Sequence, residues 1–367
     1  MCLNINLYIV IIIYERNKWG DIMDTKERFN SIYDQLKKID FSALESDRKK
    51  AKKTNKNGII KSLFLLLVFS ILSIGMLVGL ISFLQGDSGF VSADRNPIVK
   101  YRTLIFATFI FLIIWIRIKG KRGEKFKNWY KNNYIKQLCT PFVKLINPNY
   151  SYDDTKGIRE VDYNKVAISY YAEYMSKGLI TGVLNNGSSF EAGQVTTWDF
   201  DESTDSDGRV TRTKYVNFEG MCFKVNLPFN INSNVRLRSD KGKDKPSFLD
   251  KLIPFKTDDS KVKMDSEEFE KIFDVYAPNQ VLAMQIFTAD IMMELIDLHS
   301  TAADKYEITL ENDKLYIGFA NGRMFKAPGD LKINVLDKDV LYDYFYRFER
   351  DIQFIEKLIE IISKCNI

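Results

Sequence analysis

The 367-residue chain contains a single histidine, His299, and this scarcity excludes several kinds of site. A protein-held metal site that needs two histidines cannot be built, and zinc chemistry is disfavoured. The four cysteines form no CxxC pair and are scattered along the chain, at Cys2, Cys139, Cys222 and Cys365. They indicate neither a disulfide framework nor a metal cluster, and we expect no cofactor.

Recognisable catalytic motifs are also missing. The sequence has no P-loop, GxGxxG, HExxH or GxSxG motif. Carboxylates such as Asp199, Glu219 or Glu294 could act as general acids or bases, but no spacing singles out a pair. The sequence therefore names no catalytic residue, although an enzyme with an unrecognised carboxylate-based site stays open as an alternative.

Two apolar runs, Ser62–Leu84 and Thr103–Ile116, contain no charged residue. Residues 63–84 would span about 33 Å as a helix, which is enough to cross a bilayer. The second span, 97–118, has Lys100 and Arg102 near its outer end, where long side chains can reach the headgroups. We predict a transmembrane hairpin over 59–118; the alternative is a buried helical pair of a soluble protein.

Basic residues set the orientation of this hairpin. Seven lysines and arginines precede the first span, at Arg48, Lys49, Lys50, Lys52, Lys53, Lys56 and Lys61. The second span is followed by a similar cluster, whereas only Arg95, Lys100 and Arg102 lie between the two charge-free runs. Short basic flanks stay in the cytoplasm, so we expect a multi-pass protein of the bacterial inner membrane with both termini cytoplasmic.

The cluster after the second span includes Lys119, Lys121, Arg122, Lys125 and Lys127, and aromatic residues lie among the basic ones. Next to a membrane, such residues can contact anionic lipid headgroups, each for about 1 kcal/mol. The alternative is that these charges only fix the topology. The lipid bilayer is thus one expected partner, and we expect no nucleic acid.

Gly75 and Gly79 form a GxxxG pair in the first span, which would allow another helix to approach closely. That helix could be the second span, a second copy of the chain or another membrane protein. Glycines are common in membrane spans, so an incidental pair is the alternative interpretation.

The segments before and after the predicted hairpin have their own expected structures. We expect residues 1–22 to be an untranslated leader, with translation beginning at Met23; the alternatives are a disordered extension or an amphipathic anchor. Residues 24–58 should form an amphipathic helix followed by a flexible basic linker from Arg48. Residues 119–157 should form a basic juxtamembrane helix that ends near Pro141, and a connector.

The remaining chain, 158–367, is predicted to be a cytoplasmic α+β domain with a mainly antiparallel sheet covered by helices. Strands are expected at 190–200, 209–218 and 220–227, and a hairpin at 306–319 around Asn312 and Asp313. Helices are expected near 162–175, at 266–298 in pieces and from about 337 to the end. The pieces include one carrying Phe269, Ile272 and Phe273, and their apolar stripes should cover one face of the sheet.

The stretch KVKMDSEEFEKIFDVYAPNQVLAMQIFTADIMMELIDL, followed by NDKLYIGF, resembles a bacterial family catalogued as domain of unknown function 3137. FEGMCFKVNLPFN resembles its upstream strand. The chain departs from the family pattern at Ala283-Met284 and at Ala289. The resemblance covers roughly Tyr163 to the C-terminus and implies two spans before a cytoplasmic α+β domain, with no assigned activity. Members are often encoded near LemA-type membrane proteins, which implies an envelope-linked role.

These observations favour a membrane-anchored binding or regulatory module over an enzyme. The basic flanks also yield a direct test of topology. A cysteine placed in the loop 85–96 should react with an impermeant thiol reagent in intact cells, whereas one placed at the C-terminus should react only after lysis. The opposite labelling pattern would contradict the predicted orientation.

Overall fold

The computed structural model describes residues 25–54, 124–167, 170–204, 207–231, 234–239, 260–302 and 305–364. These residues belong to two compact units, one formed by 25–39, 135–326 and 338–364 and the other by 40–54, 124–134 and 327–337. The predicted transmembrane hairpin lies outside the described residues, as do Gly75, Gly79, Lys119, Lys121 and Arg122. Within the described part of the chain, no helix has the length and apolar character needed to cross a membrane.

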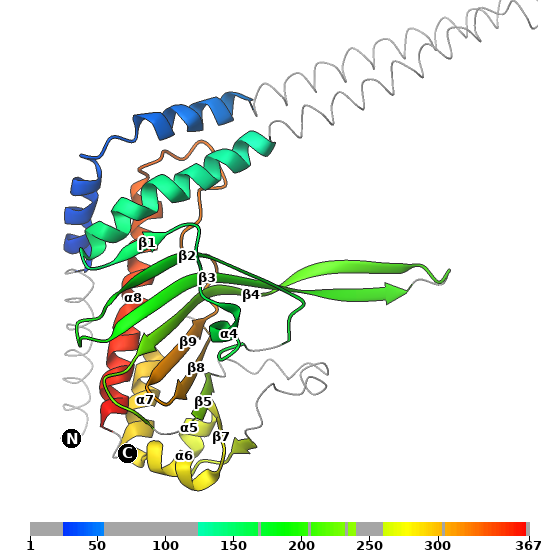
Figure 1. Cartoon of the computed structure of the whole chain (residues 1–367), viewed down its shortest axis with the longest axis vertical. Coiled ribbons are helices and arrows are strands. Elements are labelled where there is room, and N and C mark those ends of the chain that lie inside the picture. Colours follow the sequence, from blue (N-terminus) through cyan, green and yellow to red (C-terminus); the bar gives the residue numbers. More distant parts are fainter. Residues whose placement is uncertain are drawn as a thin grey trace, which may run out of the picture. The chain divides into compact units, whose positions relative to one another are not determined.

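The larger unit is built on a nine-stranded sheet with the order β1-β2-β3-β4-β9-β8-β5-β7-β6 (Figure 1). All neighbouring strands are antiparallel, which confirms the predicted α+β class and sheet type. The strands are β1 Ser151–Asp153, β2 Glu173–Val183, β3 Ser189–Thr204, β4 Val210–Asn226, β5 Asn234–Ser239, β6 Ser260–Val262, β7 Phe273–Ala277, β8 Tyr306–Glu311 and β9 Lys314–Phe319.

The hairpin predicted at 306–319 is confirmed. Strands β8 and β9 pair from Tyr306↔Phe319 to Glu311↔Lys314. Asn312 adopts a left-handed conformation with φ 56° in the two-residue turn, where an asparagine is one of the few residues that tolerates it.

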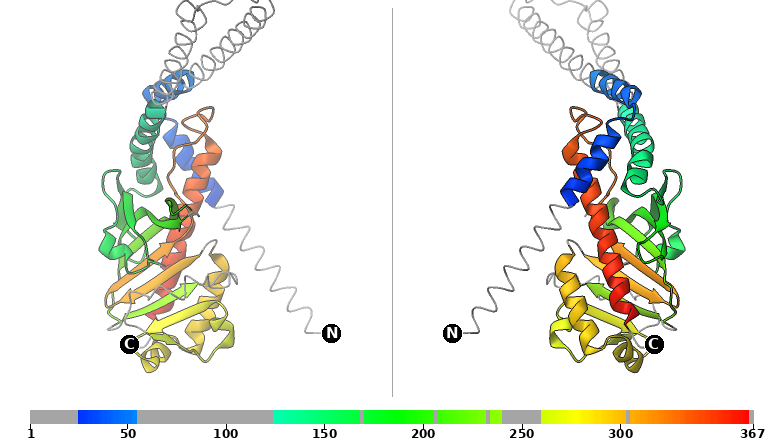
Figure 2. Two further views of the ribbon diagram at one scale, coloured as in Figure 1. Left: turned by 90° about the vertical axis from the view of Figure 1, so that its right-hand side faces the viewer. Right: turned by 90° about the vertical axis from the view of Figure 1, so that its left-hand side faces the viewer.

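Two long helices cover one face of the sheet. Helices α7 (Ala289–Thr301) and α8 (Lys338–Ser363) lie on the same side in the edge views of Figure 2. Phe354 of α8 contacts Tyr306 and Phe319, with ring centroids 4.9 and 5.5 Å apart. The apolar residues that alternate along the central strands therefore point to these helices, as the stripes on both helices predicted.

The opposite face is covered by the short helix α4 (Glu160–Tyr163) and the segments that flank it. Tyr163 and Val166 are fully buried and pack with Val195, Cys222 and Tyr316 from three central strands. Gly318 lies directly below Val166, and a Cβ atom built there would come within 3.1 Å of that side chain. The sheet is thus buried on both faces at its centre.

Two predicted helices are shorter than expected. The helix expected at 162–175 ends at Tyr163, and Glu173 already belongs to β2. The helix expected to carry Phe269, Ile272 and Phe273 is the one-turn helix α5 (Glu267–Glu270), capped by Ser266, while Phe273 begins β7. Both segments contribute strands because pairing in the sheet overrides a weak helical pattern.

The N-terminal segment and the predicted juxtamembrane segment contain longer helices than predicted. Residues 42–54 are helical and Arg48 is only 4% exposed, so 48–54 is not a flexible linker. Helix 124–146 continues past Pro141, because Phe142, Val143 and Ile146 are buried beyond it. Burial of these side chains compensates for the hydrogen bond that proline removes.

Arg48 is a buried arginine that links two segments of the smaller unit. Its Nε donates to the Glu45 carboxylate at 2.8 Å, its Nη2 reaches Asn334 Oδ1 at 3.2 Å, and its Nη1 donates to the backbone carbonyl of Leu331. Burial raises the pKa of the nearby Tyr130 to about 12. The buried guanidinium therefore ties helix 42–54 to the segment 327–337.

Helix 25–36 is part of the core of the larger unit. The Phe29 ring is fully buried and lies 5.1 Å from Tyr342 and 5.7 Å from Phe345 of α8. We expect Phe29→Ala to lower the free energy of unfolding by about 3–5 kcal/mol, because it leaves a cavity against α8. Tyr346→Ala removes a side chain of α8 that is 41% exposed, and this change should lower the free energy of unfolding far less. Denaturant unfolding of the purified chain measures both; equal effects would contradict this packing.

Candidate functional site

The predicted lipid-contacting residues fall only partly within the described structure. Lys125 and Lys127 lie in the first turns of helix 124–146; Lys125 is exposed and Lys127 half-buried. Trp129 on the same helix is 44% exposed and contacts Phe126 at a centroid distance of 5.3 Å.

The three carboxylates considered for acid–base work are not brought together. Asp199 lies on β3 and accepts a hydrogen bond from the backbone of Phe200 at 2.9 Å. Glu219 on β4 pairs with Arg323 at 2.8 Å, and Glu294 on α7 pairs with Lys364 at 2.7 Å. The three carboxylates lie on different elements and have different partners, so the geometry assembles no catalytic pair from them.

His299 lies in the last turn of α7. Its Nδ1 is 2.9 Å from the hydroxyl of Tyr306, and its ring packs edge-on against Phe273. Tyr306 is 2% exposed, and burial raises the pKa of its phenol. This arrangement ties α7 to β8 and β7.

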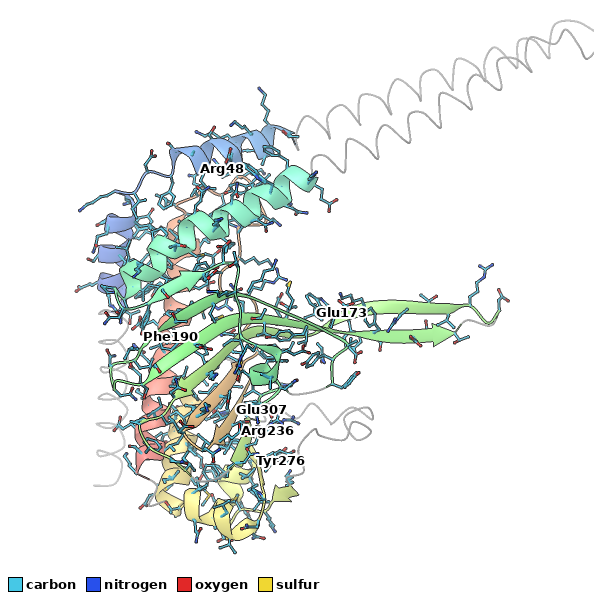
Figure 3. The ribbon with its side chains drawn as sticks, in the orientation of Figure 1. Arg48, Glu173, Phe190, Arg236, Tyr276 and Glu307 are labelled. Carbon is cyan, nitrogen blue, oxygen red and sulfur yellow. The ribbon has the colours of Figure 1, made fainter. Side chains whose placement is uncertain are left out.

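Glu307 on β8 is a buried carboxylate that sequence reasoning missed. It is fully buried and forms ion pairs with Arg236 and Arg238 of β5, close to Tyr276 in Figure 3. Arg236 also donates to the backbone carbonyl of Ala167 at 2.6 Å. Burial raises the pKa of Glu307, and the two guanidinium groups oppose that rise. The trio joins two strands to the loop after α4.

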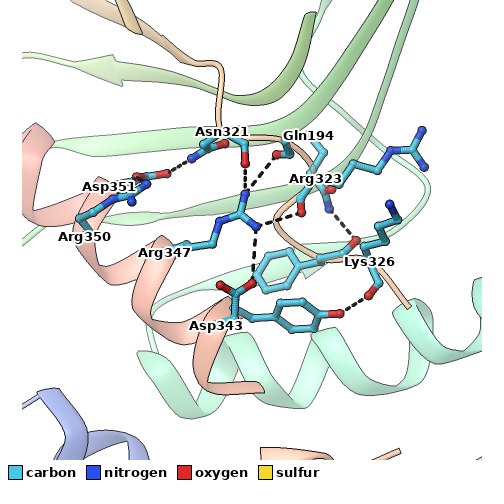
Figure 4. A network of polar contacts seen from close by, with 11 residues as sticks. Gln194, Asn321, Arg323, Lys326, Asp343, Arg347, Arg350 and Asp351 are labelled. Carbon is cyan, nitrogen blue, oxygen red and sulfur yellow. Dashed lines mark hydrogen bonds and ion pairs between the residues drawn. The ribbon is translucent and has the colours of Figure 1, made fainter. Parts of the chain in front are cut away.

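Asp351 on α8 is a second buried carboxylate, only 1% exposed (Figure 4). It accepts hydrogen bonds from Asn321 Nδ2 at 2.8 Å and from Arg350 at 2.9 Å. Arg347 donates to the backbone carbonyls of Asn321 and Arg323. This network fastens the segment after β9 to α8.

A shallow hollow lies between the β2–β3 turn, the loop after β4 and the C-terminal half of α8. It is lined by Asn185, Asn186, Pro228, Phe229, Gln353, Glu356, Lys357, Ile359, Glu360 and Ser363. Glu356 is held there by the backbone and side-chain amides of Asn185, at 2.8 and 3.1 Å. Neither Glu307 nor Asp351 lines this hollow, so it is separate from the buried carboxylates.

The clearest candidate for a binding site is the outer part of the β3–β4 hairpin. We call this part, residues 199–215, the ribbon. Figure 1 shows it extending beyond the rest of the sheet. The pairing shifts between Thr197 and Trp198, so that Asn217 is an extra residue on β4. Such a bulge increases the local twist and re-aims the strands. Asn217 is fixed by a 2.6 Å hydrogen bond to the carbonyl of Tyr170.

Among the described residues, the strands of the ribbon pair only with each other, and the side chain of Lys214 forms an ion pair with Glu173 of β2. The two ribbon strands pair from Asp199↔Tyr215 to Thr204↔Val210, whereas β2 stops pairing at Trp198 and β9 pairs no further out than Met221. No other described strand therefore pairs with either outer edge of the ribbon. Such edges can accept a strand from another chain.

Most side chains on the described part of the ribbon are exposed, and they include acidic, basic and apolar groups. Val210 is 63% exposed and Tyr215 is 38% exposed, while Val216 at the base of the ribbon is 53% exposed. Arg212 lies 4.0 Å from the ring of Phe200 and forms an ion pair with Glu202 at 3.3 Å. These cross-strand contacts join the two strands of the ribbon without burying them.

Comparison with known families identifies the C-terminal part of the chain. Residues 216–363 match the model of the family described as "Protein of unknown function (DUF3137)". We call this matched range, residues 216–363, the DUF3137 domain. The resemblance stated from the sequence is confirmed over this range, although the match does not reach back to Tyr163. The DUF3137 domain begins where β4 leaves the ribbon, so the ribbon itself precedes it.

A solved structure similar to this chain is that of the mycobacterial trehalose monomycolate transport factor A, TtfA. The identity is 9% and the TM-score is 0.32, over 57% of this chain and 86% of that chain. A similarity at this level does not bear on function. Comparison with curated proteins gives no match.

Within the DUF3137 domain, Asp351 should make stability depend on pH. Burial raises its pKa from 3.8 to about 6, despite the nearby arginines. The folded domain therefore binds this proton more tightly, and the resulting stabilisation is present below about pH 4 and is lost as the pH rises through 6. The shift corresponds to about 3 kcal/mol.

We expect Asp351→Asn to remove this dependence. The difference in unfolding free energy between the wild type and the variant should fall as the pH rises from about 4 to 7. Asp343→Asn, on the same helix with a 57% exposed side chain, is the control and should keep the wild-type dependence. Parallel pH profiles for the wild type and Asp351→Asn would show that Asp351 is not a linked proton site.

Proposed function

We propose that this protein is a membrane-anchored binding module whose DUF3137 domain faces the cytoplasm and which docks another protein through the ribbon. The two apolar runs and their basic flanks support the anchor and its orientation. The family resemblance supports an envelope-linked role, so the expected partner is a protein at the inner membrane.

The ribbon is the observation on which this proposal rests. A lone two-stranded hairpin is at best marginally stable in water, and here it is carried outward by a sheet that is buried on both faces. Its unpaired edges and exposed Val210 and Tyr215 offer hydrogen bonds and apolar contacts together. An extended segment of a partner that adds a strand to such an edge uses both kinds of contact.

The contacts of the carboxylates favour binding over the enzyme alternative. Glu307 is locked between two arginines, and Asp351 is bound by Asn321 and Arg350. Such contacts join elements of the fold and leave these groups engaged in structural bonds. No observed geometry supports a proton-transfer role for them.

A photo-crosslinking amino acid tests the docking site. The probe replaces Val210 on the ribbon or, as a control of similar exposure, Met293 on α7, which is 67% exposed. In cells, the Val210 probe should give one discrete protein adduct in the membrane fraction, and the Met293 probe should not. An adduct from Met293 with none from Val210 would contradict docking by the ribbon.

A shortened hairpin provides the second half of the test. Asp199 and Tyr215 are directly paired, so an Asn-Gly turn can replace residues 200–214 in register. With the probe at Val216, this variant should lose the adduct that the full-length ribbon gives there. Because the ribbon is exposed, the unfolding free energy should change by only about 0.5 kcal/mol. A retained adduct would place the contact outside the ribbon.

A further inference from the structure

We infer that the start of helix 124–146 lies on the surface of an anionic phospholipid bilayer and inserts Trp129 among the headgroups. The inference rests on the membrane anchor of the proposed function and adds a specific contact to it. Its residues belong to the smaller unit, away from the ribbon in sequence.

The two sides of this helix differ in burial. Tyr130 and Tyr134 are 2% and 0% exposed and form its inner side, where Tyr130 lies near Arg48. Trp129 is 44% exposed although it is the largest apolar side chain of the segment. The helix therefore keeps two tyrosines inside and leaves a tryptophan outside.

The exposed side is chemically suited to a membrane interface. The Trp129 ring contacts the half-buried Phe126 ring at a tilt, and a shallow hollow nearby is lined by Glu124, Lys125, Asn128, Trp129 and Asn132. Tryptophan is enriched at headgroup level because its ring is apolar and its N–H can remain hydrated. Lysines beside it add attraction to anionic lipid, which Glu124 partly offsets.

The position of this helix in the chain favours a bilayer over other partners. The charge-free run that ends at Ile116 is separated from Glu124 by seven residues, so a spanning helix there would deliver this segment to the membrane surface. A nucleic acid would bind the same lysines, but the predicted span places this helix next to a bilayer and not next to a nucleic acid. An amphipathic helix held at a surface places its apolar side chains roughly 5–10 Å into the headgroup region.

Tryptophan quenching tests the inference on the full chain. Trp19, Trp115 and Trp198 are replaced by phenylalanine so that only Trp129 emits; a matched protein keeps only Trp198, on β3. Both are reconstituted into phosphatidylglycerol vesicles with acyl chains brominated near the headgroup. Trp129 should lose more than half its emission and Trp198 should lose little. Lys125→Glu with Lys127→Glu should restore much of the Trp129 emission.

Two readouts separate this inference from the anchor. Resistance of the reconstituted chain to an alkaline wash reports the anchor, and quenching reports the surface contact. An incorporated chain with unquenched Trp129 overturns the inference and leaves the anchor standing. A chain that washes off but whose Trp129 is quenched by added vesicles supports the contact and overturns the anchor; a chain that shows neither overturns both. Quenching that is equal for Trp129 and Trp198, or a Trp129 that responds only to added nucleic acid, also overturns the inference.

Discussion

Helix α8 is the element against which the larger unit is packed. Phe345 faces Phe29 of the N-terminal helix, Phe348 faces Tyr150 beside β1, and Phe354 faces the central strands. One amphipathic helix thus contacts residues that precede the predicted membrane spans and residues that follow them. Because aromatic pairs add directional contacts to simple apolar burial, they fix the position of each element along α8. The sheet, the N-terminal helix and the segment after β9 all depend on this one surface.

Buried charged residues restrict how the segments of the fold are arranged. Glu307 pairs with Arg236 and Arg238, Asp351 accepts a hydrogen bond from Asn321, and Arg48 donates to the carbonyl of Leu331, so that each buried charge joins segments far apart in the chain. Such pairs add little net stability, since removing charge from water is costly. Breaking one by removing a single partner is expensive, however, so each pair penalises alternative arrangements of the segments that it joins. The apolar surfaces hold the unit together, and the ion pairs specify which arrangement is adopted.

The sequence patterns predicted the elements whose burial is periodic and local. Helix α8, helix α7 and the β8–β9 hairpin follow directly from apolar spacing and from turn residues such as Asn312. Strand β5 was missed because only Val235 and Leu237 are apolar in it, and the Glu307 that allows Arg236 to be buried lies about 70 residues away on β8. Asp351 was missed for the same reason: its partner Asn321 comes from another element.

The candidate site was only partly predictable. Strands were expected at 190–200 and 209–218, but nothing local shows that their ends leave the sheet. That outcome depends on where β2 and β9 stop pairing, which is a property of the whole sheet. The exposure of Trp129 was likewise hidden, because an aromatic residue among lysines could equally face the interior. It is the burial of Tyr130 and Tyr134 that leaves Trp129 outside.

The bonds of Arg48 have a consequence for biosynthesis. Its backbone acceptor, the carbonyl of Leu331, lies 283 residues further along the chain. Helices 42–54 and 124–134 leave the ribosome long before this acceptor exists, so the smaller unit cannot reach its final form until most of the chain has been translated. Closing so long a loop is slow compared with forming a helix. During that interval Arg48 has only Glu45, three residues before it, as a nearby charged partner, and the smaller unit matures in a late step that awaits the segment 327–337.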